Sequence, residues 1–142
     1  MAMRPFLIKA IGKTHLALYK LTRGTIGASL GGKPMLLLTT RGKRTGRLRT
    51  TPLQYLRDGE NLVIVASNGG NPSNPGWWFN LDATPEAKAQ VGKHKQRVRA
   101  ETALGEERAR LWALLVDVYP EYDGYEKETE RTIPVVILQP RE

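Results

Sequence analysis

The chain contains no cysteine, and this absence removes several kinds of chemistry at once. No disulfide framework, thiolate nucleophile or cysteine-built zinc site is available to it. Histidine is nearly absent as well: His15 and His94 stand alone, and no set of His, Asp and Glu has the spacing of metal ligands. We therefore expect no metal site, and if the chain is an enzyme, a cofactor carries the chemistry.

Acidic residues are missing from the first 57 positions, where twelve basic residues stand before the first carboxylate, Asp58. All fourteen acidic residues follow, against ten Lys and Arg. Such an asymmetry indicates an anionic partner for the N-terminal part, such as phosphate, nucleic acid or lipid head groups. The alternative is that these cations only keep the surface soluble, although such surfaces usually mix both signs.

Long apolar runs are absent too, since none approaches the roughly 20 residues of a membrane span. Lys9, Lys13 and Lys20 interrupt any apolar stretch of a signal peptide. We expect a cytoplasmic protein.

The periodicity of apolar residues divides the chain into two parts. Residues 5–21 have the pattern of an amphipathic helix, and a glycine-rich connector completes an N-terminal unit, 1–33. In the domain 34–142 we predict six strands, at 35–40, 49–56, 61–66, 88–91, 96–104 and 133–138. Helices are predicted at 77–81 and 106–118, with a short helix or loop at 122–130. Short strands with local hairpins favour an α+β fold, a mostly antiparallel six-stranded barrel with helices packed on it.

The loop Gly42-Lys43-Arg44-Thr45-Gly46 lies between two predicted strands and is followed by Arg47 and Arg49. Glycines let backbone amides approach an anion closely, and arginine offers forked donors that match phosphate oxygens. A Walker A motif is not present. The pattern predicts a phosphate site, with a solvated basic turn as the alternative.

Three further clusters are candidates for a ligand site. Ser67-Asn68-Gly69-Gly70 follows a buried strand, where adjacent glycines allow the backbone to lie against a planar ligand. Trp77-Trp78-Phe79-Asn80 gathers two tryptophans; we expect Phe79 and one of them in the core, and the other beside a ring. Tyr119, Tyr122 and Tyr125 recur every three residues, which in a helix would present three hydroxyls to one cavity, although packing against the barrel fits the spacing equally well.

Taken together, these segments resemble the deazaflavin-dependent nitroreductase family of actinobacteria, split β-barrel proteins that use coenzyme F420. The resemblance runs from about residue 34 to 140 and is collinear. Its blocks are Leu38-Thr39-Thr40-x-Gly42-Lys43-Arg44-Thr45-Gly46, Arg49-Thr50-Thr51-Pro52-Leu53, Leu56-Arg57-Asp58-Gly59, Ala66-Ser67-Asn68-Gly69-Gly70, Asn74-Pro75-Gly76-Trp77-Trp78-x-Asn80-Leu81, Tyr119-Pro120 and Arg131-Thr132-Ile133-Pro134.

The resemblance implies a role for each cluster. Lys43, Arg44 and Arg49, with Arg47 nearby, would hold the phosphate and polyglutamate tail of the coenzyme. The remaining coenzyme contacts would come from Thr51 and Pro52 beside the ring, from Ser67, Asn68, Gly69 and Gly70 at the deazaflavin head, and from Trp77 and Asn80 along the pocket. Tyr119, Tyr122 and Tyr125 would form the acceptor side. Gln54 stands where an aromatic residue is common.

The implied reaction is hydride transfer from reduced coenzyme F420 to a small electron acceptor, a quinone, an enone or a nitro compound. Ser67 and Tyr125 are the candidates to stabilise or protonate the reduced acceptor. Two alternatives stay open: a protein that binds the coenzyme without turnover, and a basic nucleic-acid-binding domain. Against the second, the sequence has no aromatic residue among the cations from Lys43 to Arg49 and no recognised nucleic-acid-binding motif, so we expect no nucleic-acid partner. The basic N-terminal helix indicates peripheral contact with anionic membranes, or a lid, or packing on the barrel or another subunit. The sequence leaves monomer and homodimer open.

Overall fold

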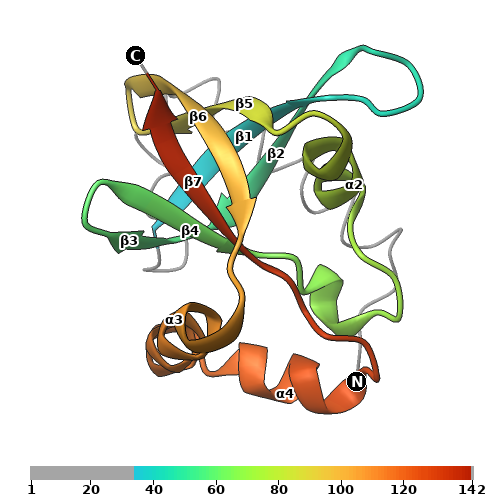
Figure 1. Ribbon diagram of the computed structural model, residues 1–142, viewed down its shortest axis with the longest axis vertical. Helices are drawn as coiled ribbons and strands as arrows, with labels where there is room; N and C mark the ends of the chain where they lie inside the picture. Colours follow the sequence, from blue (N-terminus) through green and yellow to red (C-terminus); the bar gives the residue numbers. More distant parts are fainter. Residues whose placement is uncertain (1–33, 142) are drawn as a thin grey trace.

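The structure is a computed structural model in which residues 34–141 are described. This part is α+β, with seven strands in one antiparallel sheet of order β2-β1-β5-β6-β7-β4-β3 and three α-helices (Figure 1). The strands are β1 (Met35–Arg41), β2 (Leu48–Gln54), β3 (Leu56–Asp58), β4 (Asn61–Val65), β5 (Glu86–Val91), β6 (His94–Thr102) and β7 (Val135–Arg141). The helices are α2 (Gly76–Ala83), α3 (Gly105–Val118) and α4 (Glu121–Glu128), and a single 3₁₀ turn, η2, spans Asn68–Gly70. The predicted helix at 5–21 and its connector lie outside the described residues.

The prediction of six strands is wrong, because the segment 49–56 forms two strands instead of one. Leu53 pairs with Leu36 of β1, whereas Leu56 pairs with Val63 of β4. Tyr55 is the single residue at which the chain changes partner. Strand composition alone cannot show such a change, because it is the same on both sides of the break.

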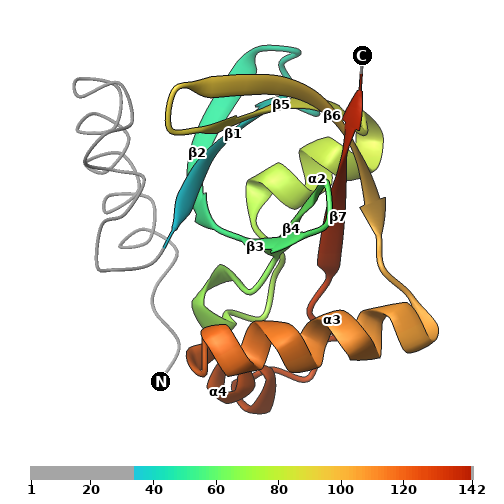
Figure 2. The ribbon, with the colours of Figure 1, turned by 90° about the vertical axis from the view of Figure 1, so that its left-hand side faces the viewer.

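Strands β2 and β3 are consecutive in the chain yet stand at opposite ends of the sheet order. The sheet must therefore curl until its two ends approach each other, and β2 also contacts β4. Figure 2 shows this curvature, with α3 and α4 below the sheet.

Two apolar cores lie on the two faces of β4 and β7. Leu62 and Ile64 point into the barrel core, which also contains Leu36, Leu38, Ala89, Val98, Leu138, Trp77 and Leu81. Val63 and Val65 point the other way, into a helix-side core with Leu111, Leu115, Tyr119 and Ile133. Successive strand residues face opposite sides, so burial of both faces explains why these strands read as unbroken apolar runs.

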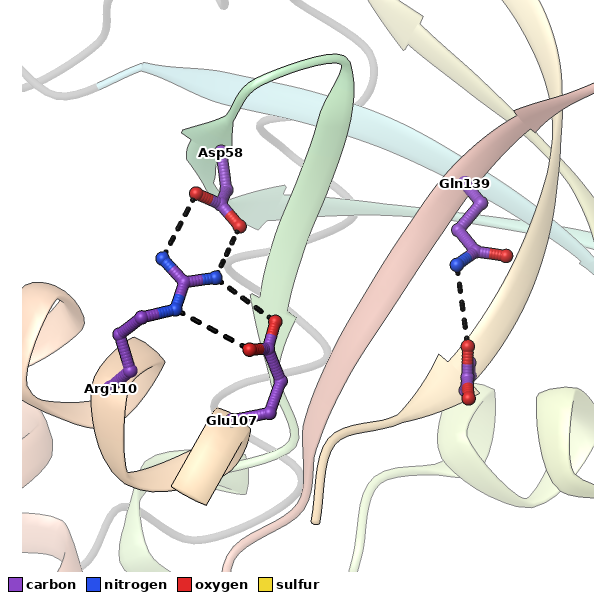
Figure 3. Close-up of polar contacts among 5 residues, drawn as sticks. Asp58, Glu107, Arg110 and Gln139 are labelled. Carbon is purple, nitrogen blue, oxygen red and sulfur yellow. Dashed lines mark hydrogen bonds and ion pairs between the residues drawn. The ribbon is translucent and has the colours of Figure 1, made fainter. Parts of the chain in front are cut away.

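Helix α3 is joined to the β3–β4 hairpin by the Arg110 guanidinium, which donates to both carboxylate oxygens of Asp58 at 2.8 and 3.2 Å (Figure 3). The same guanidinium bonds Glu107, one helical turn earlier, at 3.0 Å. On the other side of the picture, the Gln139 amide of β7 donates to Glu101 of β6 at 3.3 Å. The Asp58 contact joins α3 to the β3–β4 hairpin, the Glu107 contact lies within α3, and the Gln139 contact joins β7 to β6.

Across residues 34–141, no helix combines the length and the apolar character needed to cross a bilayer.

Candidate functional site

The loop between β1 and β2 owes its shape to its own backbone. The Gly42 N–H donates to the Arg47 carbonyl at 2.7 Å, and the Gly46 N–H donates to the Gly42 carbonyl at 2.9 Å. Gly46 has a φ of +72°, which residues with a β-carbon rarely adopt. The Arg41 guanidinium bonds the Gly46 carbonyl at 2.7 Å. The backbone is thereby closed on itself while the cationic side chains extend outward.

Asn80 of α2 connects this loop to the barrel. Its side-chain oxygen accepts the backbone N–H of Lys43 at 2.9 Å, and its amide group donates to the Thr40 hydroxyl at 3.0 Å. Thr40 is buried, with 1% of its surface exposed. One amide therefore fixes the basic loop against α2 and against the end of β1.

A groove of about 790 Å³ lies between the loop and α2. Its walls come from the loop, the start of β2 and the first two turns of α2: Gly42, Lys43, Arg44, Thr45, Arg49, Gly76, Phe79 and Asn80. Among residues 34–141, none of the groove cations pairs with a carboxylate. Helix α2 begins at Gly76 with no side-chain cap and no acidic residue in its first turn. A helix N-terminus and unpaired cations both attract anions, so the groove is a candidate anion site.

The structure brings together four of the residues predicted to bind the coenzyme: Lys43, Arg44, Arg49 and Asn80. Other predicted contacts lie elsewhere. Arg47 is exposed on the loop, and Thr51 and Pro52 pair with Leu38 and Leu37 of β1 without lining the groove.

The aromatic residues of α2 differ from the prediction in two respects. One tryptophan was expected in the core, and it is Trp77, 6% exposed in the barrel core, whereas the resemblance implied that Trp77 would lie along the pocket; it does not line the groove. Phe79 was expected in the core, but it is 39% exposed and lines the groove, with the Lys43 ammonium 5.9 Å from its ring centre. The side of α2 that carries Phe79 faces the basic loop, which the sequence pattern of so short a helix does not disclose.

The glycine loop after β4 adopts an uncommon backbone. Asn68, Gly69 and Gly70 all have positive φ, of 49°, 63° and 81°. A β-carbon on Gly70 would lie 3.4 Å from Cα of Tyr125 and 3.0 Å from a carboxylate oxygen of Glu128, so the loop touches α4 closely. The loop is not part of the groove wall; it leads through Pro75 into α2, whose first residue is. The two predicted clusters, the glycine loop and the tyrosines, thus meet at Gly70.

The three tyrosines do not share one helix, because α3 ends at Val118, before Pro120. Their rings nevertheless follow one another, with centres 5.5 Å apart for Tyr119 and Tyr122 and 6.3 Å apart for Tyr122 and Tyr125. The Tyr119 hydroxyl donates to the Tyr55 carbonyl at 2.7 Å, and the Tyr122 hydroxyl donates to the Gln54 side-chain oxygen at 3.3 Å. Two hydroxyls are therefore engaged within the protein, and Tyr125 is the most exposed of the three.

Burial raises the pKa of all three phenols, that of Tyr122 furthest above its ordinary value. Desolvation disfavours the charged phenolate, so each hydroxyl stays protonated at neutral pH. A protonated phenol is a hydrogen-bond donor, which suits a site where negative charge develops on an acceptor oxygen.

Arg131 lies beside the glycine loop, and the sequence predicted no role for it. It appeared only as the first residue of one of the blocks that carry the resemblance. It stands between α4 and β7, and its guanidinium binds four acceptors around the glycine loop. The available signal was an arginine two positions before the buried run 133–138, a position where a cation needs several acceptors.

Comparisons with known proteins agree with this architecture. The family model described as F420H(2)-dependent quinone reductase matches residues 11–140. An F420H(2)-dependent quinone reductase of Mycobacterium tuberculosis is 41% identical over 133 residues, covering 91% of this chain and 89% of its own.

Two solved structures are also similar. One, described as an F420-H2 dependent reductase, has a TM-score of 0.70 and 38% identity, covering 75% of this chain and 94% of its own. A second, described as a domain-swapped dimer, has a TM-score of 0.73 and 35% identity, covering 89% of this chain and 94% of its own. The family match spans most of the chain and the curated relative is well above 30% identical, so the chain belongs to the F420H(2)-dependent quinone reductase family.

Proposed function

We propose that the groove between the basic loop and α2 binds the phosphate and polyglutamate part of coenzyme F420, and that the glycine loop Ser67–Gly70 binds its deazaflavin ring. The chain is an oxidoreductase that uses reduced coenzyme F420 to reduce a quinone, as its family does. The observation that carries the placement is the groove itself, where three cations and an uncapped helix N-terminus converge without a carboxylate from the described residues.

The donor set of the groove fits this coenzyme. Lys43, Arg44 and Arg49 are exposed, so they can reach a ligand that carries several negative charges along its length. Arginine matches phosphate and carboxylate oxygens with two parallel N–H donors, and each charge-assisted bond is stronger than a neutral one. Arg47, on the same loop, extends the cationic surface toward solvent, where the glutamate tail would end.

The reacting end of the site is assigned to the loop and to α4. When bound, the reduced coenzyme supplies a hydride from its deazaflavin ring. Conversion of a quinone to a quinol takes up one hydride and one proton, so the protein must hold a proton donor near the acceptor oxygen. We assign that role to the Tyr125 phenol or the Ser67 hydroxyl, because Gly70 brings the loop against Tyr125. Burial keeps the pKa of Tyr125 raised and its proton in place.

The acceptor side is assigned to Tyr122, Tyr125 and Gln54. Tyr119 packs against Tyr122 on the buried side, since it is fully buried and its hydroxyl is bonded to the Tyr55 carbonyl. Gln54 accepts the Tyr122 hydroxyl, so a polar contact takes the place of an aromatic side chain at this position. Quinones are the acceptors we assign first, and enones and nitro compounds are further candidates of similar electrophilic character.

The test is a titration of the purified protein with oxidised and reduced coenzyme, followed by tryptophan fluorescence, and then addition of menadione, enones and nitroaromatic compounds. We expect binding at micromolar coenzyme and oxidation of the reduced form by menadione. Failure to bind at that concentration overturns the proposal. Binding without oxidation by any acceptor would instead favour a protein that sequesters the coenzyme.

Contact with an anionic membrane through residues 1–33 remains a proposal, carried by the basic amphipathic pattern of 5–21. Co-sedimentation with vesicles that contain anionic lipid, compared for the full chain and for a chain lacking 1–23, decides it. Equal sedimentation of the two proteins contradicts it. Light scattering after gel filtration distinguishes a monomer from a homodimer.

A further inference from the structure

Arg131 lies in the connection between α4 and β7 and binds backbone and side-chain oxygens on both sides of the glycine loop. Its Nη2 donates to the carbonyls of Ala66 and Ser67 at 3.0 and 2.8 Å. Its Nε donates to the Asn71 carbonyl at 3.0 Å, and its Nη1 donates to the Asn74 side-chain oxygen at 2.5 Å. One side chain therefore forms hydrogen bonds with the loop where it leaves β4, at 66 and 67, and where it approaches α2, at 71 and 74.

The loop needs an external restraint because of its backbone. Three successive residues from Asn68 to Gly70 have positive φ, and one of them, Asn68, is not glycine. Its internal bonds are short in range: the Asn68 carbonyl accepts the Asn71 N–H at 3.2 Å and the Asn71 side-chain amide at 2.6 Å, and the Gly70 N–H donates to the Ser67 carbonyl at 2.9 Å. The Asn68 side-chain amide also donates to the Ser73 carbonyl at 3.0 Å. None of these bonds joins the loop to β7 or α4. Backbone in sparsely populated regions persists only where its surroundings hold it, and functional sites are where such backbone gathers.

The same guanidinium joins the loop to the helix that carries the acceptor-side tyrosines. Arg131 follows α4 by three residues, and Gly70 is in van der Waals range of Tyr125 on that helix. The Ala66 N–H also donates to the Pro134 carbonyl at 2.9 Å, so the end of β4 is bonded to the segment just after Arg131. The loop, α4 and the start of β7 are thus one connected unit with Arg131 at its centre.

The arginine fork cannot be replaced by a simple cation. Its planar group sends donors in several fixed directions, whereas a lysine ammonium is a point charge on a flexible stem. Among residues 34–141, no carboxylate pairs with Arg131. Only carbonyl and amide oxygens surround its charge, and burial lowers its pKa. A partly buried cation without a carboxylate is costly, so its acceptors must stay in place.

We propose that Arg131 is a positioning residue: by binding the four oxygens around Ser67–Asn74, it holds the loop in the conformation that receives the deazaflavin ring against Tyr125. This inference rests on the proposed function, which assigns the loop to the ring. Arg131 acts through the loop and does not itself take part in the chemistry.

The test compares Arg131→Met and Arg131→Lys with the matched control Arg108→Met. Arg108 is also a partly buried arginine: it binds the Ile133 carbonyl at 2.8 Å, pairs with Glu126 of α4 at 3.9 Å and lies 4.9 Å from the centre of the Trp112 ring. None of these contacts is with residues 67–74. Four quantities are measured for each purified protein: melting temperature, amide hydrogen exchange of 67–74, coenzyme dissociation constant, and kcat and KM for menadione.

We expect both Arg131 variants to show faster exchange in 67–74, weaker coenzyme binding, and a kcat/KM lower by about 10- to 100-fold, the cost of a misplaced reacting group. Arg108→Met should lower the melting temperature comparably but leave exchange in 67–74 and coenzyme affinity within about twofold of wild type, the scatter of a neutral substitution. Lysine should fail to rescue, because one ammonium cannot satisfy four divergent oxygens.

Unchanged exchange in 67–74 and unchanged coenzyme affinity in Arg131→Lys would overturn the proposal, even if Arg131→Met failed to fold. An effect on melting temperature alone, equal to that of Arg108→Met, would also overturn it, since it would make the residue merely structural. Failure of the proposed function has a different signature: the wild-type protein itself would not bind the coenzyme, while hydrogen exchange would still report whether Arg131 holds the loop.

Discussion

The side-chain oxygen of Asn80 accepts the backbone N–H of Lys43 at 2.9 Å, across 37 residues of sequence. The same amide donates to Thr40, so the basic loop and α2 are held at a fixed separation across the groove. A site for an extended anion benefits from such a fixed separation. If the loop were mobile, binding would have to order it, and the entropy lost would weaken the affinity for the anion. We therefore expect Asn80 to contribute to binding although it carries no charge.

Substitution of Asn80 should separate the loop's geometry from its charge. Asn80→Ala removes both bonds and leaves the buried Thr40 hydroxyl without this partner, at a cost of about 1–3 kcal/mol of stability. Asn80→Asp keeps an acceptor for Lys43 but places a negative charge beside the groove. We expect Asn80→Asp to be the more stable variant and the weaker binder of coenzyme, by calorimetric titration. Equal affinities would show that the charge of the groove does not govern binding.

The cations of the groove should govern coenzyme affinity in a salt-dependent way. Lys43→Ala or Arg49→Ala should raise the dissociation constant by about 10- to 100-fold, the worth of one charge-assisted bond. The wild-type affinity should fall as ionic strength rises, and less steeply in the variants, because fewer charges remain to be screened. Arg57→Ala is the control, since Arg57 is an exposed cation of β3 away from the groove. A loss in Arg57→Ala equal to that in Lys43→Ala would mean that only net charge counts.

Tyr119 should prove important for stability through one hydroxyl. Its hydroxyl bonds the carbonyl of Tyr55, the residue at which the chain passes from β2 to β3. Tyr119→Phe leaves that carbonyl without this donor, and we expect a loss of about 1–3 kcal/mol in the free energy of unfolding. Urea denaturation measures it. Tyr125→Phe is the comparison, because its more exposed hydroxyl bonds none of the described residues; a larger loss there would contradict the account.

The contact between Asp58 and Arg110 should make stability depend on pH. The guanidinium hydrogen bonds lower the pKa of Asp58 below its ordinary value, 3.8. A carboxyl whose pKa is lower in the folded state stabilises the fold above its unfolded pKa, and this contribution disappears as the pH falls through the folded pKa. Wild type should therefore exceed Asp58→Asn in stability by a constant amount at neutral pH, and the difference should shrink below about pH 4.

The measurement for this pair is urea denaturation of both proteins across the acidic range. The difference should be small, because the pair is partly exposed and water and salt screen it. Asp82→Asn, an exposed carboxyl of α2 that Arg110 does not contact, is the control. A stability difference between wild type and Asp58→Asn that grows on acidification would reverse the predicted sign and exclude this linkage.

The sequence was most informative where local pattern and burial coincide. The strand at 61–66 and the helix at 106–118 were expected from apolar runs and spacing, and both occur, as β4 and α3, with boundaries shifted by one residue. The loop from Gly42 to Arg49 was singled out as a candidate anion site because glycine and arginine chemistry is local, and the structure places Lys43, Arg44 and Arg49 along one groove. Pattern failed at Tyr55, where one strand became two, because the partner of a strand is decided by distant residues.

The misses at the site have the same cause. Arg131 gathers oxygens from residues 57 to 65 positions away, and no window of sequence contains them together. Phe79 and Trp77 are two residues apart in a helix of eight, so which of them meets the core depends on how α2 lies on the barrel. The tyrosines were singled out by spacing and their rings are neighbours, but that spacing does not show that Tyr119 lies outside the helix or that its hydroxyl bonds Tyr55.

The place of β7 in the sheet has a consequence for synthesis. It is the last described strand to be made, yet it lies between β6 and β4, in the interior of the strand order. Until Val135–Arg141 has left the ribosome, the β3–β4 hairpin cannot pair with any other strand of the sheet, because its only other ladder among the described strands is the one between β4 and β7. The apolar side chains of β4 then lack the neighbours that β7 provides. Truncation at β7 would therefore divide the barrel instead of shortening it.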